Sequence, residues 1–235
     1  MDHDLTRRAT AEAVGTALLV AIVVGSGIYA QRLSPNDVGL QLLENSIATG
    51  AGLVALILAF GRVSGGHFNP VVTLAERITG GTTTRDTVVY SVAQVIGACA
   101  GAMIANLMFG LSAVTLSTHT RSSGGLWLGE FIATFGLLIT ILGVVRSGRA
   151  SIAAFAVGGY IAAAYWFTSS TSFANPAVTI GRTLTNTFAG IRPSSAPMFI
   201  VMQITGGLLA VAAGLYWYPT PREDELIVPH ETEAA

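Results

Sequence analysis

Apolar residues fall into six long runs separated by short polar stretches. A helix needs about 20 mostly apolar residues to cross the roughly 30 Å hydrocarbon core of a membrane. The runs meet this length or come close to it, and they cover about residues 11–30, 42–61, 87–109, 127–146, 151–168 and 197–218. None of them shows the strict alternation of a half-buried strand. The pattern therefore predicts an all-α membrane protein with six spans.

A short motif occurs twice between the predicted spans, as Asn69-Pro70-Val71 and as Asn175-Pro176-Ala177. Asparagine is a good helix N-cap and proline is tolerated at the first helical position, so each motif predicts a helix start. The two helices, about 69–78 and 175–185, would be roughly 15 Å long, half of the bilayer core. They must therefore re-enter the membrane. Non-helical backbone at that depth requires a protein-lined or water-filled cavity.

The two halves of the chain repeat one another, at about 11–109 and 127–218. Glu12 corresponds to Glu130, Asn69 to Asn175, and Gln94 to Gln203, at offsets of 118, 106 and 109 residues. Each half contains three spans, so the second half enters the membrane from the opposite side. This is an inverted repeat, and its functional site is expected near the midplane.

Composition supports a membrane protein: of 235 residues, 51% are hydrophobic and 11% are charged. A net charge of −1 gives no basis for nucleic-acid binding. The single cysteine, Cys99, excludes a disulfide framework, and no metal-ligand spacing or paired nucleophile and base is present. We therefore expect no enzyme activity, metal or cofactor. Residues 219–235 are predicted to be a disordered acidic tail.

The distribution of arginine predicts which side each loop faces, because cytoplasmic loops are richer in Lys and Arg. With the N-terminus inside, eight arginines are cytoplasmic and four lie outside. The cytoplasmic ones are Arg7, Arg8, Arg62, Arg77, Arg85, Arg146, Arg149 and Arg222, and the outer ones are Arg32, Arg121, Arg182 and Arg192. We expect a multi-pass protein of the inner (plasma) membrane with both termini cytoplasmic, residues 1–10 being a cytoplasmic N-terminus.

The sequence resembles the aquaporin family, also called the major intrinsic proteins. The resemblance lies in the six spans, the inverted repeat, the two Asn-Pro motifs, and the acid and glutamine that recur in each half. The resemblance covers about residues 10–218 and implies a channel of six tilted helices and two half-helices, assembled as a homotetramer in the lipid bilayer. It implies that Asn69 and Asn175 offer amide donors to a passing solute, and that Glu12 and Glu130 are buried acids that hold the re-entrant loops. Half-helix N-termini at the midplane would each add roughly half a positive charge and repel cations.

His67 precedes Asn69 by two residues, and the sequence leaves two interpretations open. It lines the pore, or it is a hydrogen-bonded loop residue.

The second motif departs from the family pattern. Water and glycerol channels of this family usually have arginine directly after the second Asn-Pro-Ala, where this chain has Val178, and an aromatic residue where it has Thr49. The filter would be wider and would lack a fixed positive charge. Ser172 is expected to complete its wall, together with either Tyr165 or Ala163, because loop lengths leave the last position ambiguous.

Thr49 and Val178 together resemble the bacterial aquaporins associated with arsenic resistance. That resemblance implies a passive channel for arsenite as neutral As(OH)₃ and for related metalloid or polyol-like solutes, with water. The alternatives are a general water or glycerol channel and, with less support, a coupled secondary transporter.

Overall fold

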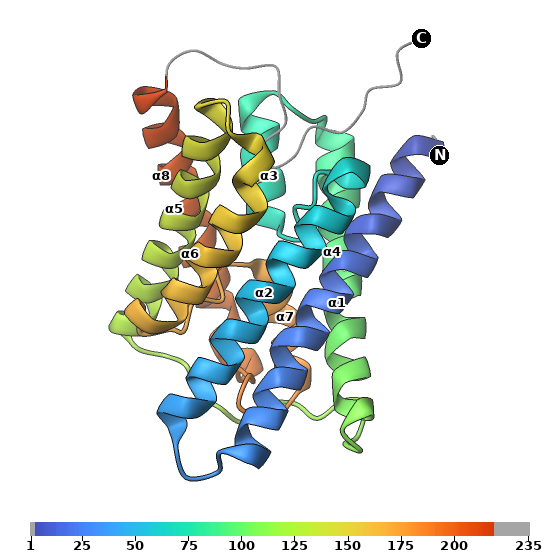
Figure 1. The fold of residues 1–235 in the computed structure, drawn as a ribbon, viewed down its shortest axis with the longest axis vertical. Coiled ribbons are helices and arrows are strands. Elements are labelled where there is room, and N and C mark those ends of the chain that lie inside the picture. The colour runs from blue at the N-terminus through green and yellow to red at the C-terminus, as the bar shows by residue number, and fades with distance from the viewer. Residues whose placement is uncertain (1–2, 219–235) are drawn as a thin grey trace.

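The protein is a bundle of helices (Figure 1), and the computed structural model describes residues 3–218. The helices are α1 His3–Leu33, α2 Val38–Ser64, α3 Pro70–Thr79, α4 Thr84–Met108, α5 Gly124–Arg146, α6 Ala153–Phe167, α7 Pro176–Gly181 and α8 Ala196–Trp217, with three short 3₁₀ turns. No strand occurs in this part of the chain, so the predicted all-α fold is confirmed. The predicted tail at 219–235 lies outside the described residues.

Six of these helices are long and apolar enough to cross a membrane, which confirms the six predicted spans within residues 3–218. α1 begins at His3, inside the segment 1–10 that was expected to precede the span. Its first turns are stabilised by ion pairs from Asp4 to Arg7 and Arg8, and Arg8 also reaches Asp86 at the start of α4. Acids at a helix start and pairs at i,i+3 and i,i+4 both favour helix.

The inverted repeat is visible in the packing. α1 packs on α4 and α2, as α5 packs on α8 and α6, and both half-helices, α3 and α7, contact α4 and α8. The N-terminus and the last turn of α8 lie at the same end of the bundle (Figure 1). We call this the proximal end. The opposite end, with the α1–α2 and α4–α5 connections, is the distal end.

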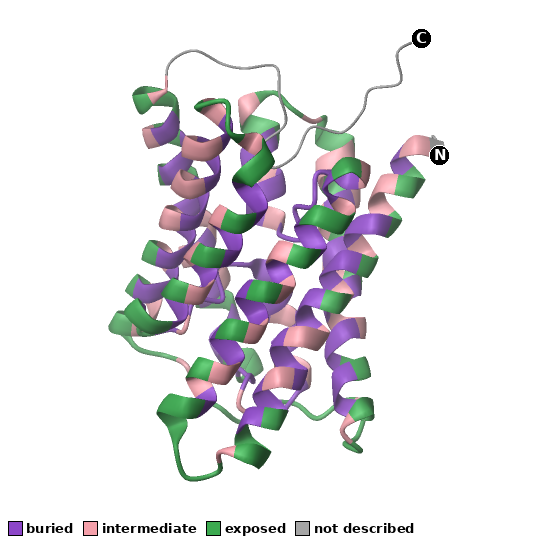
Figure 2. Cartoon of the chain, viewed as in Figure 1, coloured by how far each residue is buried: buried purple, intermediate pink, exposed green. Residues whose placement is uncertain are grey.

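Small residues let the paired helices touch. A Cβ at Gly97 or Gly101 of α4 would overlap the carbonyl oxygens of α1, and one at Gly206 of α8 would overlap Phe131 of α5. These contacts agree with the role of small residues in membrane helix packing. Exposed residues lie mostly on the outward faces of the helices (Figure 2), and many of them are large and apolar, as a lipid-facing surface requires.

The half-helices differ in length. α3 runs from Pro70 to Thr79, close to the prediction, and ends on Gly80 in the left-handed conformation. α7 ends at Gly181 and continues only as a 3₁₀ turn to Leu184, so the helix predicted over 175–185 is shorter than expected. Thr185 is extended, and the carbonyl of Arg182 accepts a bond from the amide of Ile191, nine residues further along, so the chain leaves helical geometry here.

Candidate functional site: a cavity between the two half-helices

Each Asn-Pro motif starts a half-helix, as the sequence indicates. The side-chain oxygen of Asn69 accepts the Val71 amide at 3.0 Å, and that of Asn175 accepts the amides of Ala177 and Val178 at 2.9 and 3.2 Å. Both asparagines therefore cap backbone N–H groups that the helix itself leaves without partners.

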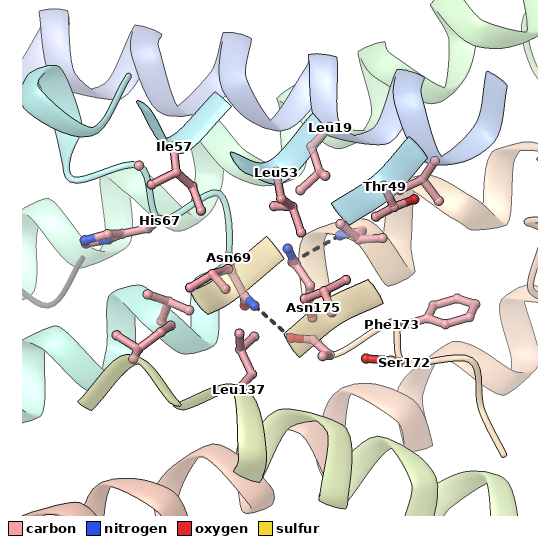
Figure 3. A pocket seen from close by; sticks show the side chains of 18 of the residues that line it. Leu19, Thr49, Leu53, Ile57, His67, Asn69, Leu137, Ser172, Phe173 and Asn175 are labelled. Carbon is pink, nitrogen blue, oxygen red and sulfur yellow. Dashed lines mark hydrogen bonds between the residues drawn. The ribbon is translucent and has the colours of Figure 1, made fainter. Parts of the chain in front are cut away.

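The two asparagines also tie the half-helices together across the centre of the molecule (Figure 3). Nδ2 of Asn69 donates to the carbonyl of Ala174, and Nδ2 of Asn175 donates to the carbonyl of Phe68, both at 2.7 Å. Each amide nitrogen has two hydrogens, so one hydrogen of each remains for another acceptor. Both residues also line the central cavity.

The residue before each asparagine is strained in the same way. Phe68 and Ala174 both have φ of +49°, a left-handed conformation that costs a side-chain-bearing residue about 1–3 kcal/mol. A buried carboxylate compensates in each half. Glu12 accepts the Phe68 amide at 2.7 Å and Glu130 accepts the Ala174 amide at 2.9 Å.

The carboxylates also bond further groups in their own half of the bundle. Gln94 donates to Glu12 and to Thr73, and Gln203 donates to Glu130 and Thr179 in the same way. The remaining donors are the hydroxyl of Ser64 and the amide of His67 for Glu12, and the amide of Phe173 for Glu130. Both acids are fully buried, and these bonds explain how they can be accommodated in a membrane interior.

A cavity runs past the two asparagines, and the volume open to the centres of water molecules is about 50 Å³. One water needs roughly 10–15 Å³ by this measure, so several can fit. Much of the wall is apolar and comes from α1, α2, α5 and α6, at Leu19, Val23, Leu53, Ile57, Leu137, Ile141, Val157 and Ile161. Polar groups come chiefly from the re-entrant segments. A solute in the cavity would contact apolar side chains of these four helices and hydrogen-bonding groups of the re-entrant segments.

The distal part of the wall contains four residues that the sequence singled out: Thr49, Tyr165, Ser172 and Val178. We call them the candidate filter. The hydroxyls of Thr49 and Tyr165 are hydrogen-bonded at 3.1 Å. The buried Ser172 hydroxyl has no partner among the described residues.

The alternative filter residue, Ala163, is wrongly placed by the sequence count. It is exposed on the outer face of α6, because the wall positions of that helix recur every four residues, at Val157, Ile161 and Tyr165.

Of the motif residues, the two prolines and the following Val71 and Ala177 do not line the cavity. They form the first helical turns, and Val71 packs against Gly207 of α8.

His67 lies in the proximal part of the wall (Figure 3). Its Nε2 is 2.8 Å from Oε2 of Glu76, and its Nδ1 is 3.1 Å from the hydroxyl of Thr73. His67 lines the cavity and is also held by its neighbours, so the two interpretations are compatible, and a role in the pore stays a prediction.

A charged residue of the wall was not predicted from the sequence. Arg182 was counted among the charges of an outer loop, but it is 2% exposed and lines the cavity. Its guanidinium carbon lies 3.3 Å from the ring centre of Phe173, and its Nε donates to the carbonyl of Ala189. Arg121, from the α4–α5 connection, lies 5.2 Å from the same ring. Burial lowers the pKa of the Arg121 guanidinium, but arginine keeps its proton in proteins.

Comparison with known proteins agrees with this architecture. The family model described as Major intrinsic protein matches residues 1–172, and aquaglyceroporin AqpS of Rhizobium meliloti (strain 1021) is 51% identical over 211 residues, 90% of each chain. The chain belongs to the major intrinsic protein family. Aquaporin AqpM of Methanothermobacter marburgensis, another relative, is 32% identical over 90% of this chain and 97% of its own. The X-ray structure of the aquaglyceroporin from Plasmodium falciparum shares the fold, with a TM-score of 0.68 and 20% identity over 90% of this chain and 95% of that one.

Major intrinsic proteins are channels, so this protein is a membrane channel for water and small solutes and not an enzyme. Within residues 3–218, no group of three or more His, Cys, Asp or Glu side chains is arranged to hold a metal. The family match ends three residues before Asn175. Val178 and Arg182 therefore lie beyond the residues matched by the family model.

Proposed function

We propose that the channel passes small neutral solutes down their gradients, most readily arsenite as As(OH)₃ and related metalloid or polyol-like molecules, together with water. The observation that carries the proposal is that Val178 lies in the same cavity wall as Thr49, where larger or charged side chains would make the channel narrower. The hydroxyls of Thr49, Tyr165 and Ser172 supply the hydrogen-bonding groups that suit a hydroxylated solute.

A neutral trihydroxy compound fits the rest of the wall. It can face the apolar side with its centre and exchange hydrogen bonds with the free amide hydrogens of Asn69 and Asn175. The name of the relative AqpS, an aquaglyceroporin, supports small polyol-like solutes. We further propose a homotetramer in the inner membrane with the proximal end in the cytoplasm. Light scattering of the purified protein and labelling of the termini in sealed cells would test these two points.

The test is uptake into lipid vesicles that contain the purified protein, measured at pH 7 for arsenite, glycerol and water. Wild type should pass arsenite well above empty vesicles. Val178→Arg should reduce arsenite uptake about tenfold or more, because a long cationic side chain would enter the cavity at the candidate filter. Val178→Leu, which adds bulk without charge, is the matched control and should reduce uptake less.

The outcomes separate the alternatives. Wild-type uptake of glycerol and water without arsenite would overturn the metalloid assignment and leave a general water or glycerol channel, which relatives named aquaporin make the second candidate. Uptake that saturates at low solute and requires a proton or sodium gradient would indicate a coupled transporter instead.

A further inference from the structure

We propose that Arg182 supplies the fixed positive charge of the distal half of the pore and excludes cations there while neutral solutes pass. The inference rests on the proposed function as a neutral-solute channel. The candidate filter itself supplies no fixed charge, since its four residues are all uncharged near neutral pH. They are Thr49, Tyr165, Ser172 and Val178.

The first argument is the position of the guanidinium. A charged side chain inside a membrane protein is costly and is kept where it faces a cavity or a partner. Arg182 is almost fully buried, yet it contributes to the cavity wall. Only its Nε has a hydrogen-bond acceptor among the described residues, the carbonyl of Ala189. The two terminal nitrogens are therefore available on the cavity side.

The second argument is that the charge is not neutralised. Within residues 3–218, no carboxylate lies in ion-pair distance of Arg182 or of Arg121. The charged and titratable groups near Arg182 are Arg121, Glu130 and Tyr165. Glu130 is already bonded to two loop amides and to a glutamine. Two guanidinium groups and one carboxylate leave this part of the wall positive.

The third argument comes from the repeat. Arg182 follows Asn175 by seven residues and contacts Phe173, two residues before it. Glu76 follows Asn69 by seven residues and contacts His67, two residues before it. The fold thus brings the same two positions together in both halves. Only in the distal half is the contact between a cation and a ring, an attractive arrangement that fixes the guanidinium without cancelling its charge.

The consequence is a barrier for cations. Unit charges a few ångströms apart in a partly buried site interact strongly enough to change occupancy by one to two orders of magnitude. A neutral solute does not meet this penalty, because it carries no charge. Loss of the charge should therefore increase cation leak and spare neutral flux.

The experiment uses the full-length protein in vesicles and measures two fluxes: proton or potassium leak, and glycerol uptake. Arg182→Gln should raise cation leak about tenfold or more and change glycerol uptake by a much smaller factor, because glutamine keeps a neutral hydrogen-bond donor in the wall. Arg192→Gln is the matched control, since it removes the same charge from an exposed position at the same end of the bundle. It should leave both fluxes unchanged. Arg182→Gln vesicles that take up glycerol and remain as tight to cations as wild type would overturn the proposal.

A second variant decides the question if Arg182→Gln does not assemble. Arg182→Lys keeps a cation, but a lysine amine can lose its proton as the pH rises, whereas a guanidinium cannot. Burial beside Arg121 favours the neutral amine, so Arg182→Lys vesicles should leak more and more as the pH is raised from 6 to 10, while wild type stays tight. A leak in Arg182→Lys that does not depend on pH would contradict the assignment. The metalloid proposal fails separately, through absent arsenite uptake in wild type with cation exclusion intact.

Discussion

The proximal and distal halves of this channel are built on one scaffold. In both, an acid on the first helix of the repeat accepts the amides of the re-entrant loop, a glutamine bonds that acid and a threonine of the half-helix, and an asparagine caps the half-helix and crosses to the other loop. All of these groups hold backbone in place. The halves differ instead in the pair formed by the residue two positions before each asparagine and the residue seven positions after it.

That pair shows how an inverted repeat becomes an asymmetric pore. The proximal half places the carboxylate of Glu76 beside the imidazole of His67, and the distal half places the guanidinium of Arg182 on the ring of Phe173. The same two positions are in contact in both halves, but the charged residue of the pair is an acid in the proximal half and an arginine in the distal half. The groups that hold the loops are therefore common to both halves, whereas the residues paired next to the cavity differ between them.

The largest effect is expected from removing the acid that holds each loop. Glu12→Ala leaves four buried donors without an acceptor, and Glu130→Ala leaves three. At about 1–3 kcal/mol for each unsatisfied donor, both variants should lose several kcal/mol of stability, and Glu12→Ala should lose more. The temperature at which the purified protein aggregates in detergent measures this loss. Thr10→Ala, at an exposed position on α1, is the control. Wild-type stability in both glutamate variants would show that the carboxylates are not what holds the loops.

Most of this scaffold could be predicted from the sequence because its signals are local or duplicated. The apolar runs give the spans, Asn69 and Asn175 mark helix starts, and the repeated acids and glutamines show where equivalent partners lie. The wall was harder to predict. The count from Asn175 allowed Tyr165 or Ala163, and the helical phase of α6 decides between them.

Arg182 was not predicted because an arginine after an apolar stretch has the signature of a loop. Its burial depends on the early end of α7 and on a ring nine residues earlier in the chain, and neither is a local property. One signal did exist. When the two Asn-Pro motifs are aligned, Arg182 occupies the position equivalent to Glu76, and Phe173 the position equivalent to His67. The sequence alone therefore shows a charged residue at the same position in both halves.

An intermediate effect is expected from the His67–Glu76 and Phe173–Arg182 pairs. Double-mutant cycles with His67→Gln and Glu76→Gln, and with Phe173→Leu and Arg182→Gln, should give coupling energies of about 1–3 and about 0.5–2 kcal/mol respectively. The proximal coupling should increase as the pH is lowered from 8 to 6, because protonation adds a charge to the imidazole. The distal coupling should not change, because arginine remains charged. Denaturation in detergent at each pH measures both. Equal, pH-independent couplings would mean that the two pairs do not differ in charge as described.

The smallest effect is expected at the Thr49–Tyr165 hydrogen bond, which joins α2 to α6 across the candidate filter. Tyr165→Phe removes one hydroxyl with little change in shape, so stability should fall by only about 0.5–1.5 kcal/mol. Glycerol uptake should fall about twofold through loss of a hydrogen-bonding group, and water flux should hardly change, since the opening keeps its width. Ala163→Ser, two residues away on the exposed face of the same helix, should change neither flux. If Ala163→Ser alters glycerol uptake as much as Tyr165→Phe does, the wrong face of α6 has been assigned to the cavity wall. The difference between the distal and proximal halves would then have to be described with the residues of the other face.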